Sequence, residues 1–89
     1  MRYLPNRRVK LAQRVNKKLR KAFAKTLVEL RKEKGLTQEQ VAFGADLHRT
    51  TIAYFEGDKM QPSIDAIFRI AKGLDIEPYI LIQKVQEKI

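Results

Sequence analysis

The chain has 89 residues, with 19 Lys and Arg against 10 Asp and Glu and a formal net charge of +9. A chain of this length makes one domain, and at this size about 60% of the unfolded surface can be buried, so its stability is marginal. It has no Cys, which excludes disulfides and thiolate metal sites. No apolar run approaches the ~20 residues of a membrane span, and no apolar signal core follows the basic N-terminus, so we expect a cytoplasmic protein with no membrane partner.

Positive charge is concentrated at the N-terminal end of the chain. Residues 1–28 hold 10 of the 19 Lys and Arg and no Asp or Glu, whereas residues 29–89 carry nine basic and ten acidic side chains, a net charge of −1. Such a field attracts polyanions and supplies affinity for nucleic acid without sequence preference. A solubilising tail and a basic helix on a membrane surface are the alternatives, and the motif at residues 35–56 favours nucleic acid over both.

The N-terminal segment has two interpretations. Pro5 allows a helix to begin, and apolar residues recur at steps of three and four up to Leu30, which is consistent with one long helix to Lys34. Equally, the like charges between residues 14 and 21 repel one another along a helix, so that residues 1 to about 18 form a loose arm that orders only on DNA. Arms of that kind enter the minor groove or follow phosphates. The candidate contacts in such an arm are Arg2, Arg7 and Arg8.

A helix is expected to begin after Thr37. The Thr37 hydroxyl suits an N-cap, and Gln40 three residues later can reach back to the Thr37 backbone N–H, which completes a capping box. The apolar side of this helix consists of Val41, Ala42 and Ala45. Asp46 then stands where the chain needs a left-handed backbone, which Asp tolerates better than most non-glycine residues.

A second short helix follows at residues 48–56. Ile52 and Phe55 turn inward together at 3.6 residues per turn. The opposite side carries Arg49, Thr50, Ala53 and Tyr54. Two short helices joined by a tight turn, the second with small polar and basic groups facing out, describe a helix-turn-helix. The alternative is two core helices of an ordinary small domain, but capping, spacing, outward chemistry and charge together favour DNA recognition.

A turn-rich run without periodicity occupies residues 57–63, and Ser63 then caps another helix behind Pro62. The predicted apolar stripe of this helix is Ile64, Ile67, Phe68, Ala71 and Leu74. Gly73 lies near its C-terminal end. We expect this helix to contribute to the core and to have no function of its own.

The last segment begins with Pro78 at a first-turn position and continues to the C-terminus. One face is predicted to carry Tyr79, Ile82, Val85 and Ile89, with Leu81 at its edge. That is more apolar surface than a terminal helix of a small monomer leaves in water, which predicts a dimer interface. The alternative is a helix folded back on its own core.

The segments LRKEKGLTQEQVA and HRTTIAYFEGDKMQPSIDAIFRIAKGLDI resemble the Xre/Cro/cI family of helix-turn-helix regulators, over about residues 23–76. The resemblance implies an all-α fold: a compact bundle of about five helices with a lambda-repressor-like helix-turn-helix, here with a basic N-terminal extension. It also implies that Arg31 pairs with Glu56 under the helix-turn-helix. By the same resemblance Gln38 holds a phosphate and Lys59 touches the DNA backbone. An exposed Arg31 beside phosphates and a solvated Lys59 are the alternatives.

The second helix of the motif would enter the major groove, with bases read by its N-terminal half. Arg49 is the strongest candidate, because its planar fork matches O6 and N7 of guanine and a good bidentate pair discriminates by ~1–3 kcal/mol. The hydroxyl groups of Thr50 and Thr51 suit bases, and Tyr54 suits a phosphate or a base. The full predicted DNA-binding set is Thr37, Gln38, His48, Arg49, Thr50, Thr51, Tyr54 and Lys59, with Arg7 and Arg8 of the N-terminal segment.

Three positions depart from the family pattern. Asp46 stands where glycine is usual, His48 where Ser or Thr is usual, and Gly57 followed by Asp58 replaces the more common order. These departures leave the fold intact and bear on the angle of the recognition helix. His48, the only histidine, is interpreted as a weak cap or a phosphate contact rather than a pH switch or metal ligand.

The sequence therefore predicts a sequence-specific transcriptional regulator, more a repressor than an activator, that binds double-stranded DNA as a homodimer and prefers an inverted repeat. The predicted organisation is a basic extension at 1–22, a DNA-binding domain at 23–76 and a dimerisation helix at 77–89. No enzymatic activity, cofactor or small-molecule ligand is expected, because no Gly-rich phosphate loop and no spaced metal ligands are present.

Two other functions stay open. One is an antitoxin-type or other protein-interaction module whose DNA binding is secondary, and the other is nonspecific nucleic-acid binding through the basic arm alone. Phage, plasmid, restriction-system controller and chromosomal roles are equally compatible with the residues.

Overall fold

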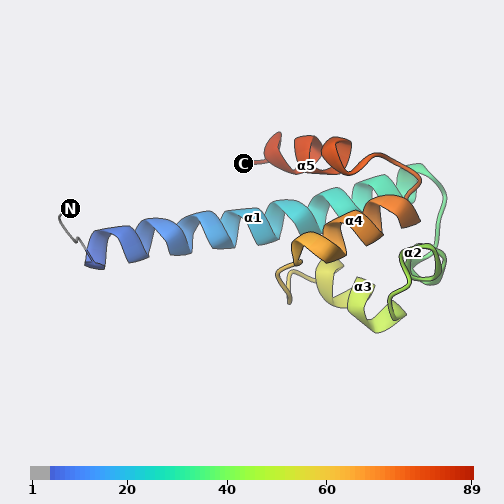
Figure 1. Cartoon of the computed structure of the whole chain (residues 1–89), viewed down its shortest axis with the longest axis horizontal. Coiled ribbons are helices and arrows are strands. Elements are labelled where there is room, and N and C mark those ends of the chain that lie inside the picture. Colours follow the sequence, from blue (N-terminus) through green and yellow to red (C-terminus); the bar gives the residue numbers. More distant parts are fainter. Residues whose placement is uncertain (1–4) are drawn as a thin grey trace.

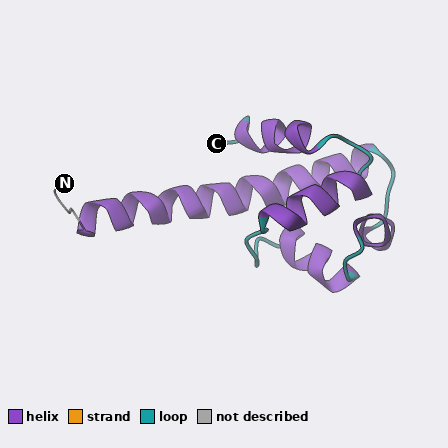
Figure 2. Cartoon of the chain, in the orientation of Figure 1, coloured by secondary structure: helices purple, strands orange, loops and turns teal. Residues whose placement is uncertain are grey.

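The computed structural model describes residues 5–89, with side chains from residue 13 onward, and these residues form helices and loops only. The helices in chain order are α1 (Pro5–Glu33), α2 (Gln38–Ala45), α3 (Arg49–Glu56), α4 (Ile64–Gly73) and α5 (Pro78–Gln86). Figure 1 shows their arrangement, and Figure 2 shows the loops that join them. α1 packs against α3 and α5, α2 packs against α3 and α4, and α4 packs against α5. The predicted all-α bundle is confirmed over these residues, and none of their helices is long and apolar enough to cross a membrane.

The N-terminal segment is part of α1, which favours the long-helix interpretation over the loose arm. No Gly or Pro interrupts the chain between residues 6 and 33, so nothing in the sequence breaks the helix. At ~1.5 Å per residue its 29 residues span about 44 Å, nearly the whole 48 Å long axis of the molecule. The N-terminal half of α1 projects beyond the other four helices (Figure 1). Gly35 ends the helix with a left-handed backbone, φ 66°.

Three aspartates in left-handed conformations end the next three helices. Asp46, Asp58 and Asp75 have φ of 54°, 58° and 57°. The left-handed Asp46 was expected and is confirmed. At the end of α3, Gly57 has an ordinary φ of −84°, so the residue that reverses the chain is Asp58. Asp accepts this conformation at a cost that Gly does not have, and the unusual residues at these turns therefore leave the helix ends in place.

The hydrophobic core lies where the short helices meet the C-terminal half of α1. Phe23 and Phe55 make an edge-to-face contact with ring centroids 5.6 Å apart, the geometry that aromatic quadrupoles favour. The largest fully buried apolar side chains are Leu27, Val41, Ile52, Ile70, Leu74 and Leu81. Because α3 contributes Ile52 and Phe55 to this core, its opposite side is held outward.

The predicted apolar stripe of α4 is partly wrong. Ile64 and Phe68 are exposed, Phe68 at 55%. The buried residues of α4 are instead Ala66, Ile70 and Ala71, with Leu74 just beyond its end. The helix is thus rotated relative to the prediction, which missed both Ala66 and the fully buried Ile70.

A close approach between α2 and α4 explains this rotation. The two helices meet at Gly44 and Gly73, where a Cβ added to Gly73 would lie 2.5 Å from the Val41 carbonyl oxygen. A Cβ added to Gly44 would lie 2.9 Å from the Gly73 Cα. Helices this close leave room only for small residues at the crossing, so Ala66 and Ala71 face inward together with Ile70, while Ile64 and Phe68 are exposed.

The predicted face of α5 is also corrected. Leu81 is fully buried and Val85 is buried, and both lie in the core of the single chain. Because α5 packs these two residues, four apart, onto the body, they are assigned to the core of the single chain rather than to its exposed apolar face. Tyr79, Ile82 and Ile89 remain exposed. The alternative of a helix folded back on its own core is therefore correct for one side of α5.

Replacing Gly73 with Ala is expected to destabilise the fold. Although Ala favours a helix over Gly by ~1 kcal/mol, the added methyl would overlap the Val41 carbonyl, and such overpacking typically costs ~1–3 kcal/mol. Urea unfolding followed by circular dichroism measures the change, with Lys72→Ala at the neighbouring exposed position as the control. Equal stability of Gly73→Ala and the unmodified chain would contradict the close crossing.

Candidate nucleic-acid interface

The start of α2 is fixed by the predicted capping box. The Thr37 hydroxyl accepts a hydrogen bond from the Gln40 backbone N–H at 3.1 Å, and the Gln40 side chain accepts one from the Thr37 N–H at 2.8 Å. These two bonds satisfy donors that a helix start leaves unpaired. Gln38 is the first residue of α2 and stands at an N-terminus whose remaining N–H groups can receive an anion.

α3 presents a polar face to solvent. Ile52 is fully buried and Phe55 is buried, whereas Arg49, Thr50 and Tyr54 are exposed. Thr51 and Ala53 are half-buried at the flanks of this face. The predicted inward and outward sides of the recognition helix are therefore both as expected. Side chains that can donate or accept hydrogen bonds lie within two turns on one exposed surface.

His48 occupies the N-cap position of α3 and is exposed. Its side chain makes no capping hydrogen bond, so its interpretation as a weak cap is not supported. The interpretation as a phosphate contact is compatible with its exposure beside Arg49.

A buried ion pair under the motif joins three helices. The Arg31 Nε and Nη2 groups donate to the two carboxylate oxygens of Glu56 at 2.6 and 3.0 Å, a bidentate arrangement. Arg31 Nη1 donates to the Leu36 carbonyl at 2.9 Å, and the Gln38 side-chain amide donates to Glu56 at 3.0 Å. The side chains of Arg31 and Glu56 are only 14% and 7% exposed. The ion pair implied by the resemblance is thus present, and the exposed-arginine alternative is wrong.

The contact between Arg31 and Glu56 also raises the pKa of Arg31 above its ordinary value, because the hydrogen bond and the charge of Glu56 stabilise the guanidinium more than burial destabilises it. A group whose pKa is higher in the folded than in the unfolded protein stabilises the fold fully at every pH below its pKa in the unfolded state. The arginine side of the pair therefore stays charged throughout the physiological range.

Among the ion pairs that were not predicted from the sequence, two involve residues of the motif or of the loop after it. Arg20 of α1 donates to Asp58 at 2.8 Å and so ties the loop after α3 to α1. Glu39 of α2 lies 3.9 Å from the Arg49 guanidinium, with both side chains largely exposed. These partners are 38 and 10 positions apart in the chain, and no local spacing rule links residues so far apart.

The remaining predicted contacts divide into two groups. Lys59 is exposed directly after α3, where its backbone N–H donates to the Tyr54 carbonyl at 2.9 Å. The side chains of Arg7 and Arg8, and the whole of Arg2, lie outside the described residues. In the part of the chain with described side chains, no group of three or more His, Asp or Glu could hold a metal ion.

Comparison with known proteins identifies the family. The sequence model described as helix-turn-helix matches residues 27–81 of this chain, which include all of α2, α3 and α4. This chain belongs to the helix-turn-helix family. The matched region contains the capping box, the ion pair and the exposed face of α3. The family is one of DNA-binding regulators and not of enzymes.

Relatives within the helix-turn-helix family are control proteins. Control protein C.BamHI of Bacillus amyloliquefaciens is 35% identical over 65 residues, which cover 72% of this chain and 80% of that protein. The restriction-modification controller protein C.AhdI from Aeromonas hydrophila has a TM-score of 0.66 and 39% identity, covering 70% of this chain and 94% of that one. C.Esp1396I, solved as a tetramer in complex with its natural 35 base-pair operator, has a TM-score of 0.74 and 27% identity, covering 79% of this chain and 92% of that one.

Breaking the ion pair under the motif is expected to cost stability. Arg31→Met keeps the aliphatic stem but strands the Glu56 carboxylate, so the free energy of unfolding should fall by about 3 kcal/mol, the low end of the range for buried pairs. The matched control is Arg69→Met, which removes an exposed arginine paired with Asp65 and should change stability little. Chemical denaturation measures both, and equal effects of the two substitutions would show that the Arg31 pair has no special structural role.

Proposed function

We propose that this protein controls transcription by binding a specific DNA sequence as a dimer, with α3 in the major groove. The observation that carries the proposal is the two-sided character of α3: Ile52 and Phe55 fix it to the core while Arg49, Thr50 and Tyr54 stand free on one exposed face. A helix held this way can present side chains to base edges without any rearrangement of the protein. The family membership supports the same conclusion, and the antitoxin-type alternative is not favoured.

Arg49 is proposed to read guanine. Its guanidinium is exposed and within 3.9 Å of Glu39, a contact that is weak in water and leaves its donors free for O6 and N7. The neighbouring Thr50 hydroxyl can donate or accept, and its methyl group suits thymine. Glu39, on the same side, would repel phosphates that approach in a wrong register.

Phosphate contacts would fix the position of α3 on the duplex. Gln38 lies at the N-terminus of α2 and gives one of its amide hydrogens to Glu56, which leaves the other available for a phosphate. Lys59 is proposed to contact the backbone at the opposite end of α3. The N-terminal half of α1 adds positive charge that binds polyanions at any sequence. Its exposed basic residues in the described part are Arg14, Lys17, Lys18 and Lys21.

A homodimer would use the exposed side of α5. Tyr79, Ile82 and Ile89 remain available there after Leu81 and Val85 are assigned to the core. The proposed organisation is therefore a basic extension at 1–22, a DNA-binding domain at 23–76, and a terminal segment at 77–89 that completes the core and forms the interface. Two recognition helices related by a two-fold axis would meet successive major grooves ~34–36 Å apart.

Among the biological roles compatible with the sequence, the relatives favour control of a restriction-modification system. C.AhdI and C.Esp1396I are described as restriction-modification controllers, and C.Esp1396I has been solved on operator DNA. We infer that this chain has the same kind of role, acts in the cytoplasm where the DNA lies, represses transcription more than it activates it, and is not an enzyme.

Selection from a random DNA pool is expected to return an inverted repeat. The two-fold symmetry of a dimer requires identical half-sites, and the size of the bound face limits each to a few base pairs. Sequencing of the bound fraction measures motif and symmetry together. Enrichment of no motif would leave only nonspecific binding through the basic end of α1, and a single unrepeated half-site would contradict a dimer on DNA.

Two substitutions should separate sequence reading from backbone binding. Arg49→Ala is expected to weaken binding to the selected sequence by ~1–3 kcal/mol while changing the affinity for random DNA little. Lys59→Ala should weaken binding to both about equally and lower the slope of log K against log salt by about one. Fluorescence anisotropy titrations at several salt concentrations measure both effects. A uniform loss with Arg49→Ala would contradict its role in base recognition.

A further inference from the structure

One side of α1 carries a line of basic side chains that is separate from the exposed face of α3. Its members recur at steps of four, three, four and seven positions, so they share one side of the helix. All of them are exposed, and among the described side chains none of them has an ion-pair partner. The residues of this basic stripe are Arg14, Lys18, Lys21, Lys25 and Lys32.

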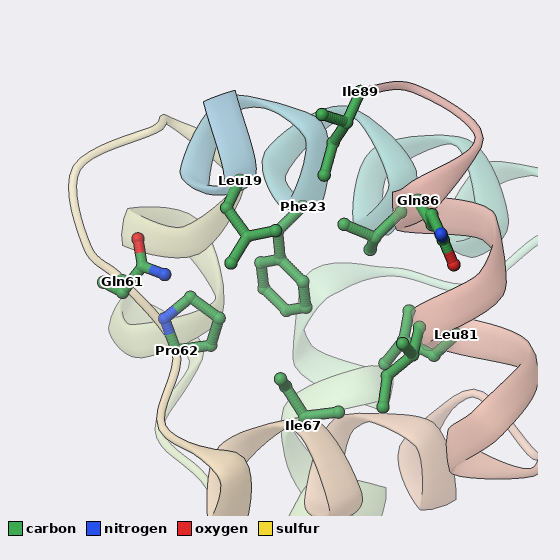
Figure 3. A pocket seen from close by; sticks show the side chains of 10 residues that line it. Leu19, Phe23, Gln61, Pro62, Ile67, Leu81, Gln86 and Ile89 are labelled. Atoms are coloured by element: carbon green, nitrogen blue, oxygen red, sulfur yellow. The ribbon is translucent and has the colours of Figure 1, made fainter. Parts of the chain in front are cut away.

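The basic stripe points away from α3. Phe23 lies two positions after Lys21, and two positions turn a helix by about 200° at 3.6 residues per turn. Figure 3 shows Phe23 pointing from α1 into the body, where its ring packs edge-to-face on Phe55 of α3. In the same way Leu27, two positions after Lys25, is fully buried. The stripe therefore lies on the side of α1 opposite the core and α3.

The separation is too large for the stripe to act on the duplex that α3 reads. Each of two packed helices is about 10–12 Å across with its side chains, so about 20 Å lies between the outer sides of α1 and α3. The Debye length at physiological ionic strength is about 8 Å. Charge on the stripe is therefore largely screened from that duplex, and a phosphate that the stripe contacts belongs to another segment.

The acidic residues of α1 leave the stripe positively charged. They are Glu29 and Glu33. The Glu29 carboxylate lies 2.9 Å from the Lys88 ammonium group, so these two charges offset each other, and Glu33 is one position from Lys32, about 100° around the helix. Like charges three and four positions apart destabilise a helix, so a bound polyanion relieves a repulsion that the free chain carries. A recess of about 460 Å³ beside the stripe has as its charged lining residues Lys18, Lys21, Lys25, Glu29 and Lys88.

The chemistry of the stripe fits a DNA duplex better than a single strand or a protein. Single strands are held by aromatic side chains on which bases stack, and the aromatic residue between positions 13 and 34, Phe23, is buried. A protein interface needs apolar anchors at its centre, and the five stripe residues are all basic. They form a straight row of charges from position 14 to position 32, about 27 Å at ~1.5 Å per residue. That length is the rise of about eight base pairs.

We propose that the basic stripe is a second DNA site, which binds the phosphate backbone of a duplex segment other than the one that α3 reads. The protein then bridges two duplex segments, one bound through its base sequence and one bound through charge alone. The inference rests on the proposed function for the first segment, and it names the partner of the far side of α1.

The test holds the full chain on a bead-bound duplex with the selected sequence and then adds a labelled duplex that lacks this sequence. The unmodified chain is expected to retain the label. The double variant Lys21→Gln/Lys25→Gln should retain at least about tenfold less at ~0.1 M salt, because each lost phosphate contact removes a counterion-release contribution of about 0.9 in the slope of log K against log salt. The matched control Lys72→Gln/Lys84→Gln removes two exposed charges from α4 and α5 and should stay within about twofold of the unmodified chain.

Affinity for the selected sequence, measured by fluorescence anisotropy, should stay nearly constant in both double variants. A fall that matches the loss of label would place the stripe on the first duplex and overturn the proposal. An unmodified chain that retains no label would overturn it as well. Poly-L-glutamate that displaces the label as well as unlabelled duplex does, at equal charge, would assign the stripe to an acidic protein instead.

Lysine acetylation followed by mass spectrometry gives a second measurement that needs no substitution. With the selected duplex alone, Lys59 should be protected while Lys21 and Lys25 react as in the free chain. Added random duplex should protect Lys21 and Lys25 several-fold, and Lys72 should react throughout. Protection of Lys21 by the selected duplex alone, or no protection by random duplex, would contradict a second site. Selection from a random pool tests α3 and these assays test the stripe, so the failure of one is distinguishable from the failure of the other.

Discussion

The bidentate pair between Arg31 and Glu56 is the interaction on which the geometry of the DNA-binding face depends. Arg31 belongs to α1 and Glu56 is the last residue of α3, while Gln38 at the start of α2 donates to the same carboxylate. Three helices that contribute to the motif thus meet at one charged centre. Because a partly buried charge without its partner is strongly unfavourable, this centre fixes the far end of α3 against α1 and the first turn of α2 against both.

Besides the ion pair, steric constraints hold the recognition helix in place. The contact of Gly44 with Gly73 brings α2 and α4 closer than side chains would allow, and the left-handed Asp46 and Asp58 set the direction of the chain on either side of α3. The edge-to-face pair of Phe23 and Phe55 holds the inner side of α3 to α1. Few degrees of freedom remain for the recognition helix, which is the property a base-reading element needs.

Local chemistry in the sequence was sufficient to predict what depends on neighbours in the chain. The capping box at Thr37 and the left-handed Asp46 are set within four residues, so both were predicted correctly. The inward side of α4 was not, because Phe68 and Ala66 lie on different sides and only the distance to α2 decides which side is inside. Leu81 was placed at the edge of a surface for the same reason: the spacing of apolar residues defines a stripe but not what covers it. The pair of Arg20 with Asp58 links residues 38 apart and has no local signal.

Because α1 is unbroken, its N-terminal half is a rigid extension of the body rather than a flexible tail. The same helix holds Arg31 under the recognition helix and continues without a hinge to Pro5. A flexible tail samples many distances from its body, whereas a helix sets one. The contacts made by the two ends of α1 are therefore held at a fixed separation and a fixed angle. This geometry, and not the length of a flexible tether, determines which contacts can form at the same time.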